Sequence, residues 1–212
     1  MRLIPALLGS LLIASLSSPA RAHPVAYRGS LGLMGYLSKD MTDLEVNYSV
    51  RHWFAPSLQL LRYNEGTGRP DMLLAKANFL AKRWNGPASQ GNLYLHGGGG
   101  VSRLTGANRG VYHLGVTADW ETRRVYVLGH TDVIRDGHGT QASYWKLRAG
   151  FAPYLAEFDR LHTWLVLEVN RKSVGSGNVE VVPTLRFFYE NVLWEVGTSL
   201  SGNVHLNYII HI

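Results

Sequence analysis

Histidine is the residue type in this chain that offers the most to chemistry. The sequence holds nine histidines, and His113 and His130 share a polar face with Asp132 in two stretches where polar and apolar residues alternate. Imidazole nitrogen and carboxylate oxygen together bind Zn²⁺ or Cu²⁺. His113, His130 and Asp132 are therefore candidate metal ligands, and His23 could add its ring nitrogen. Histidines that simply fill a polar interior are the alternative interpretation.

Acyl transfer is the second kind of chemistry that the residues suggest. It needs a serine, a histidine and an orienting acid or amide. A three-residue turn at 201–203 would bring Ser199 opposite His205, with Asn207 two residues further on. These three residues are candidate catalytic residues of a lipid-modifying hydrolase or acyltransferase. Because such residue types also recur by chance on a polar face, an enzyme remains an alternative only.

Several other function classes are excluded by composition. The chain has no cysteine, which rules out a disulfide scaffold, a thiol nucleophile and a cysteine-ligated metal. Its 21 Lys and Arg and 15 Asp and Glu are spread along the chain, without the basic run that binds nucleic acid. The glycines at 97–100 are not followed by a helical pattern, so they do not predict a phosphate-binding loop. We expect no cofactor and no nucleic-acid partner.

The first 22 residues have the pattern of a secretory signal peptide. Arg2 is followed by an apolar stretch at 3–16 and by the small-residue pattern Ala20-Arg21-Ala22. The apolar stretch is too short to span a bilayer, which takes roughly 20 residues. We therefore expect cleavage after residue 22, export to the periplasm, and one domain formed by residues 23–212.

The rest of the chain alternates between polar and apolar residues with period 2, which predicts β-strands. Turn-forming residues separate the strands, and the four glycines at 97–100, with the residues up to 106, are interpreted as a flexible loop. A count of ten strands is the alternative if the third and fifth are not formed. The twelve predicted strands are 25–37, 43–53, 57–64, 72–83, 91–98, 109–120, 123–134, 142–152, 160–172, 179–189, 192–200 and 203–212.

Tight turns between these strands give testable registers. A turn at Glu121-Thr122 would place His113 opposite His130, and a turn at Glu190-Asn191 would place Arg186 opposite Glu195. A further tight turn is expected at Ala55-Pro56. In the hairpins with turns at 121–122, 190–191 and 201–203, the polar faces of the two strands coincide, as the register requires when one face is apolar.

Aromatic residues gather at one end of the predicted strands. In an even-stranded barrel with a periplasmic N-terminus, this is the periplasmic end. Amphipathic rings favour the headgroup level of a membrane, which distinguishes this pattern from that of a soluble β-barrel or sandwich. A soluble secreted β-barrel is the alternative. The aromatic residues are Trp53, Phe54, Trp84, Trp120, Phe151, Tyr154, Tyr189 and Trp194.

The last ten residues carry a resemblance to a known class. Apolar residues occupy every second position up to the final one: Val204, Leu206, Tyr208, Ile210 and Ile212. This resembles the C-terminal signature of Gram-negative outer-membrane β-barrel proteins, which usually end in an aromatic residue. The resemblance implies an all-β fold, a closed antiparallel up-and-down transmembrane β-barrel. It also implies location in the outer membrane, with membrane lipid, lipopolysaccharide and the barrel-assembly machinery as partners.

The polar faces of the strands would then line the barrel interior. We expect a narrow passive channel for small solutes or ions, or a structural or accessory membrane protein, with a metal-binding barrel as a further alternative. Arg51 and Lys82 are assigned to the same inner face. The residues expected to matter most in the lumen are Lys76, His113, His130, Asp132, Lys146, Arg148, Glu168, Arg186 and Glu195.

Overall fold

The computed structural model describes residues 23–212 except for 65–70, 105–106, 158 and 175–176. The expected signal peptide, residues 1–22, lies outside the described residues. Within the part of the chain that is described, no helical segment has the length and apolar character needed to cross a bilayer.

Twelve strands make up the fold, and the predicted alternation places them well. Ten strands, the alternative count, is wrong, because both uncertain strands form. The strands are β1 (Leu31–Ser38), β2 (Met41–Tyr48), β3 (Phe54–Tyr63), β4 (Asp71–Asn85), β5 (Ser89–Leu104), β6 (Ala107–Thr122), β7 (Val125–Asp136), β8 (Gly139–Phe151), β9 (His162–Lys172), β10 (Val179–Tyr189), β11 (Val192–Thr198) and β12 (Val204–His211).

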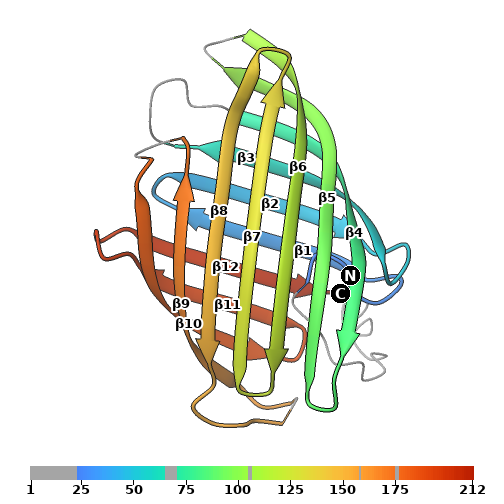
Figure 1. Ribbon diagram of the computed structural model, residues 1–212, viewed down its shortest axis with the longest axis vertical. Helices are drawn as coiled ribbons and strands as arrows, with labels where there is room; N and C mark the ends of the chain where they lie inside the picture. The colour runs from blue at the N-terminus through green and yellow to red at the C-terminus, as the bar shows by residue number, and fades with distance from the viewer. Residues whose placement is uncertain (1–22, 65–70, 105–106, 158, 175–176) are drawn as a thin grey trace, which may run out of the picture.

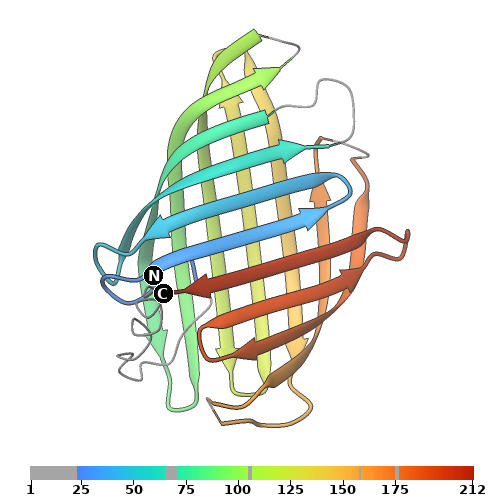
Figure 2. The ribbon, with the colours of Figure 1, turned by 180° about the vertical axis from the view of Figure 1, so that it is seen from behind.

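The strands form one closed antiparallel barrel. Each strand pairs with the next in sequence, and β1 pairs with β12 to close the ring. The strands β5–β8 face the viewer in Figure 1, and β1–β3 with β12 face the viewer in Figure 2. We call the rim with both chain ends and the turns after β2, β4, β6, β8 and β10 the termini end. The opposite rim is the distal end.

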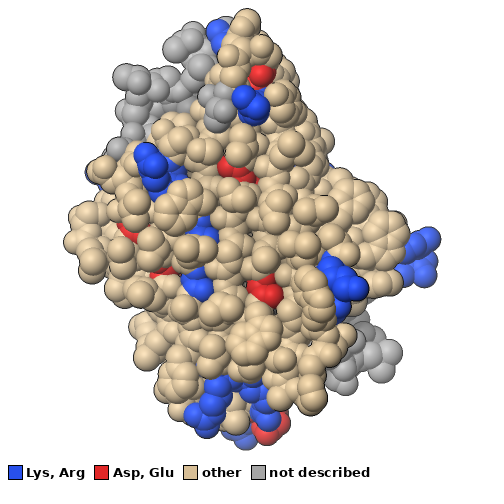
Figure 3. Space-filling model, viewed as in Figure 1, with Lys and Arg blue, Asp and Glu red and all other residues tan. Residues whose placement is uncertain are grey.

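The outer surface of the barrel is apolar and the inner surface is mostly polar. On β6, for example, the outward Leu114 is 63 % exposed whereas the inward His113 is 1 % exposed. Uncharged side chains cover most of the face over β5–β8, and Lys and Arg gather at its lower edge (Figure 3). This arrangement is the reverse of a soluble globular protein, where exposed strand faces are polar.

The aromatic residues predicted to lie at one end are all found at the termini end. Trp53 stacks on Phe79 with ring centroids 6.4 Å apart, and Phe187 stacks on Trp194 at 4.3 Å. Most of these rings are solvent-exposed, including Trp84 at 53 %. They form a girdle of exposed rings around one rim of the barrel.

The predicted glycine-rich loop is wrong, because β5 runs straight through it from Ser89 to Leu104. Gly98 and Gly100 face inward, where β4 passes very close. A Cβ on Gly100 would collide with the backbone of Leu73, and one on Gly98 with the backbone of Ala75. Glycine therefore marks a close approach of two strands here, not a turn.

Two of the predicted tight turns also differ from the structure. β6 continues to Thr122, so the turn consists of Arg123 and Arg124, and the Thr122 hydroxyl accepts the backbone N–H of Arg124 at 3.1 Å. Ala55-Pro56 lies inside β3, after a turn at residues 49–53. The turn at Glu190-Asn191 is confirmed by the pairing of Tyr189 with Val192.

The N-terminal segment folds into the mouth of the barrel at the termini end. Val25 is 2 % exposed and packs with Ala55 and Tyr94. The ring of His23 lies over Tyr94, with centroids 5.5 Å apart, and its Nδ1 is 3.6 Å from Asp119. These contacts narrow the opening before the chain enters β1.

An apolar layer fills much of the lumen near the distal end. It consists of inward-facing residues from β2, β3, β4, β6, β7 and β8, and Tyr36 of β1 packs against it. These side chains are buried and pack together in one cluster, so the interior is packed at this level. The apolar layer is Met41, Leu61, Tyr63, Met72, Leu74, Val111, Ile134, Ala142 and Tyr144.

Candidate functional site: the barrel lumen

The lumen holds a cavity of about 770 Å³. Exposed turn residues of the termini end, such as Pro87 and Arg123, line its open side. Met41, Tyr36 and Tyr144 line the opposite side, where the cavity meets the apolar layer. The cavity is therefore accessible from the termini end and closed toward the distal end. Its volume lies in the range of small-molecule sites.

A belt of hydrogen bonds runs along one wall of the lumen, from β2 to β7. Glu45 accepts hydrogen bonds from Lys76 Nζ at 2.7 Å and from Asn78 Nδ2 at 2.8 Å. The ring of His96 then bridges Asn78 Oδ1 and Thr117 Oγ1, with both contacts at 2.8 Å. These hydrogen bonds link side chains of β2, β4, β5 and β6, which orders them along the wall.

The belt ends in two histidines that share one carboxylate. His113 Nε2 lies 3.0 Å from one oxygen of Asp132, and His130 Nε2 lies 2.8 Å from the other. The predicted pairing of His113 with His130 is wrong. His130 pairs with Thr117 because the turn lies further along the chain than expected. The register moves by an even number of residues, so all three side chains still share the inner face.

The shared carboxylate contacts one ring nitrogen, Nε2, of each histidine. The other ring nitrogen of His130, Nδ1, contacts Thr117 Oγ1 at 2.8 Å. Among the described residues, no group of three or more His, Asp or Glu side chains is arranged to hold a metal ion. His23, the fourth candidate ligand, lies instead near Asp119 and Glu121 at the termini end.

An arginine–glutamate cluster occupies the opposite wall. Glu195 lies at its centre, 3 % exposed. Its carboxylate accepts hydrogen bonds from Arg186 Nε at 2.6 Å, from Arg148 Nη2 at 2.9 Å and from Asn207 Nδ2 at 2.6 Å. Arg148 also pairs with Glu168 at 3.1 Å. The predicted cross-strand pair of Arg186 and Glu195 is confirmed.

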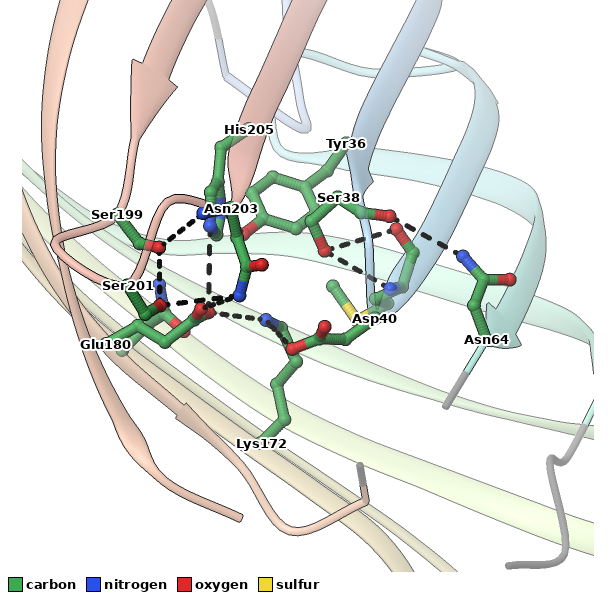
Figure 4. A network of polar contacts seen from close by, with 12 residues as sticks. Tyr36, Ser38, Asp40, Asn64, Lys172, Glu180, Ser199, Ser201, Asn203 and His205 are labelled. Carbon is green, nitrogen blue, oxygen red and sulfur yellow. Dashed lines mark hydrogen bonds and ion pairs between the residues drawn. The ribbon is translucent and has the colours of Figure 1, made fainter. Parts of the chain in front are cut away.

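A third polar network closes the lumen at the distal end, beside the apolar layer (Figure 4). Lys172 Nζ lies 3.0 Å from Glu180 and 3.6 Å from Asp40. His205 contacts the hydroxyl of Tyr36 through Nδ1 at 2.6 Å and faces Glu180 through Nε2 at 3.6 Å. This network and the apolar layer therefore lie at the same end of the lumen and share Tyr36, which packs against the layer.

The candidate catalytic residues do not form a triad in this network. Gly197, not Ser199, pairs with His205, because the turn begins earlier than predicted. The Ser199 hydroxyl contacts Ser201 Oγ at 2.8 Å and accepts the backbone N–H of Asn203 (Figure 4). Asn207 is bonded to Glu195 in the arginine–glutamate cluster. No hydrogen bond joins Ser199 to His205 among the described side chains.

The nine residues expected to matter most in the lumen all lie on inward strand faces. Two further residues assigned to the inner face do not. Arg51 is exposed in the turn after β2, and Lys82 is exposed next to a β-bulge that interrupts the alternation of β4. The inward residues are Lys76, His113, His130, Asp132, Lys146, Arg148, Glu168, Arg186 and Glu195.

Sequence reasoning missed Tyr36, Tyr144 and the apolar layer. The signal was present at 60–61 and at 72–75, where apolar residues occupy consecutive positions and alternation fails. A strand that is apolar on both faces is buried on both. In a barrel with an apolar exterior, that pattern indicates a packed lumen.

No protein-family model matches the chain, and no curated protein matches its sequence. Solved structures that resemble it include the KdgM porin, with 10 % identity and a TM-score of 0.49 over 86 % of this chain and 97 % of that one. LpxR from Salmonella typhimurium has 13 % identity and a TM-score of 0.44, over 86 % and 99 %. A loop-deletion mutant of OmpT, an outer membrane protein of Vibrio cholerae, has 10 % identity and a TM-score of 0.36, over 87 % and 97 %. At these scores the likeness adds nothing to what the strand order itself establishes.

Proposed function

We propose that the chain is an outer-membrane β-barrel whose lumen is a narrow, normally closed conduit for small solutes. The apolar exterior supports a membrane location, because lipid cannot satisfy an open strand edge and closure leaves none. The girdle of exposed rings supports placement of the termini end at the periplasmic interface. Export by a signal peptide, assembly through the C-terminal signature, and contact with membrane lipid and lipopolysaccharide belong to this proposal.

The observation that carries the conduit proposal is the position of the apolar layer across a polar lumen. A cavity large enough for a small solute reaches this layer from the termini end. Hydrophobic constrictions block ions by excluding water. A smaller void of about 10 Å³, lined partly by Leu61 and Tyr63, lies within the layer itself. Passage therefore requires these apolar side chains to move.

Truncation of the apolar layer should open the barrel. We expect the Leu61→Ala and Tyr63→Ala double variant to conduct ions severalfold more than the wild type, because both side chains are buried and line the void in the layer. The wild type should show few or small conductance steps. Single-channel recordings with refolded protein in planar lipid bilayers measure the conductance of the variant and of the wild type.

Leu60→Ala is the matched control. Leu60 is adjacent in β3 but faces outward and is 39 % exposed, so its truncation should leave conductance at the wild-type level. Heat-modifiable migration on a gel verifies that each variant has closed its barrel. A folded double variant as silent as the wild type, or a wild type that conducts steadily, would contradict the proposed closed conduit.

A further inference from the structure

The charges that face the lumen are almost all balanced by neighbours. Lys76 is paired with Glu45, Arg186 with Glu195, and Lys172 with Glu180. Arg148 has two carboxylate partners. Such pairing is what burial of charge requires. These cations are therefore occupied in holding the barrel wall together.

Lys146 differs from the other lumen cations. It lies on β8, between His130 of the belt and Asn170 of β9, and lines the cavity. Among the described residues its ammonium has no hydrogen bond and no ion pair. Its Nζ instead lies over the rings of Tyr144 and Tyr36, 5.7 and 5.9 Å from the ring centroids.

Tyr144, two residues before Lys146, supplies a second unsatisfied donor. Its side chain is 7 % exposed and lines the same cavity. Its hydroxyl is buried and has no hydrogen-bond partner among the described groups. A buried hydroxyl without a partner is rare in folded proteins and calls for an explanation. The hydroxyl of Tyr36, by contrast, is bonded to His205.

We propose that Lys146 and Tyr144 bind a small organic carboxylate inside the lumen cavity. The ammonium would supply the charge and the phenol hydroxyl a second hydrogen bond to the carboxylate oxygens. The rings of Tyr36 and Tyr144 would contact the apolar part of the ligand. This inference rests on the proposed conduit and names its solute class: anions with a compact apolar body.

The site would make the conduit prefer anionic solutes. A carboxylate that enters from the termini end meets Lys146 where the cavity reaches the apolar layer, since Tyr36 and Tyr144 belong to that side. The cations Lys76, Arg148 and Arg186 of the inner wall already have carboxylate partners. Lys146 can therefore engage a ligand at this depth without breaking an existing pair. A bound carboxylate would also supply a hydrogen-bond acceptor for the Tyr144 hydroxyl.

Benzoate is a suitable probe, with benzyl alcohol as its neutral counterpart. Titration calorimetry on the refolded full barrel, in neutral detergent micelles, should show saturable benzoate binding and much weaker benzyl alcohol binding. Lys146→Met should weaken benzoate binding by about tenfold, the effect of one charge-assisted hydrogen bond. Tyr144→Phe should weaken it by a smaller factor, and Lys146→Arg should retain it.

Lys82→Met is the matched control, because it removes one positive charge from an exposed position outside the cavity. Equal benzoate affinity in Lys146→Met and the wild type would overturn the proposal, as would equal affinity for benzoate and benzyl alcohol. The assay needs no conduction. Benzoate binding together with a Leu61→Ala and Tyr63→Ala variant that does not conduct would therefore contradict the conduit alone. A conducting double variant together with no benzoate binding would contradict the carboxylate site alone.

Discussion

Gly100→Ala should prevent most of the protein from closing its barrel. The added methyl would overlap the carbonyl oxygen of Leu73, and it would lie 2.9 Å from the Cα of Leu74, which is backbone and cannot rotate away. Gly100 pairs with Leu74 on β4 and with Val111 on β6, so displacement would disturb two ladders. Overpacking of a well-packed site commonly costs about 1–3 kcal/mol, and more where backbone must move.

The measurement is the fraction of refolded protein that migrates as the compact, heat-modifiable form. Gly97→Ala serves as the control from the same glycine run. A Cβ there would lie 3.7 Å from the Leu114 side chain, an ordinary contact, so this variant should fold like the wild type. If Gly100→Ala and Gly97→Ala fold equally well, the close approach of β4 and β5 is wrong.

Glu195→Leu should cause the largest loss of stability among single substitutions in the lumen. The carboxylate is buried and bonded to Arg186, Arg148 and Asn207. Removing it leaves Arg186 without a carboxylate partner, because Arg148 retains Glu168. Removal of one partner from a buried ion pair typically costs about 3–5 kcal/mol. Urea unfolding of the barrel in lipid vesicles measures the difference in free energy of unfolding.

Two controls separate burial from charge. Asp71→Ala removes the carboxylate of an exposed pair with Arg62 at the distal end, and it should change stability little because water screens that pair. The Arg186→Leu and Glu195→Leu double variant should recover part of the loss, since no unpaired arginine is left on β10. A Glu195→Leu protein as stable as the wild type would refute the assigned role of the cluster.

Strand positions and faces could be predicted from the sequence because alternation with period 2 is strong in most of the chain. The hairpin with Arg186 and Glu195 was predicted in the correct register, because Glu190-Asn191 is a clear turn signal. Glu190 indeed adopts a positive φ of 49°, a conformation that tight turns use.

Registers elsewhere could not be fixed from turn composition alone. Thr122 resembles a turn residue but ends β6, and the turn is built from two arginines that no propensity favours. The errors in the β6–β7 and β11–β12 hairpins were of even length, so they preserved the inner face and changed only the partners. His113, His130 and Asp132 therefore still contact one another. Ser199 and His205 share the inner face, but Gly197 takes the position opposite His205.

The glycine run was missed because glycine is also a residue of turns. Gly98 is required by the close backbone of Ala75 on the paired strand β4, and composition alone does not report how closely two paired strands approach. The apolar layer joins inward residues of β2, β3, β4, β6, β7 and β8. Adjacent apolar residues in β3 and β4 indicate that both faces of a strand are buried, but they do not report which strands meet in the lumen.

If the barrel lies in a membrane as proposed, outward side chains face hydrocarbon while their neighbours along each strand face a wet lumen. The chain has no cysteine, so spin labels can be placed one at a time on a cysteine-free background, for example at Leu114, Val116, Thr117 and Glu121 of β6. In reconstituted vesicles, labels at the two outward positions should collide with oxygen dissolved in the lipid. Labels at the two inward positions should not. If Leu114 and Val116 instead collide mainly with a water-soluble relaxation reagent, the barrel does not lie in a membrane.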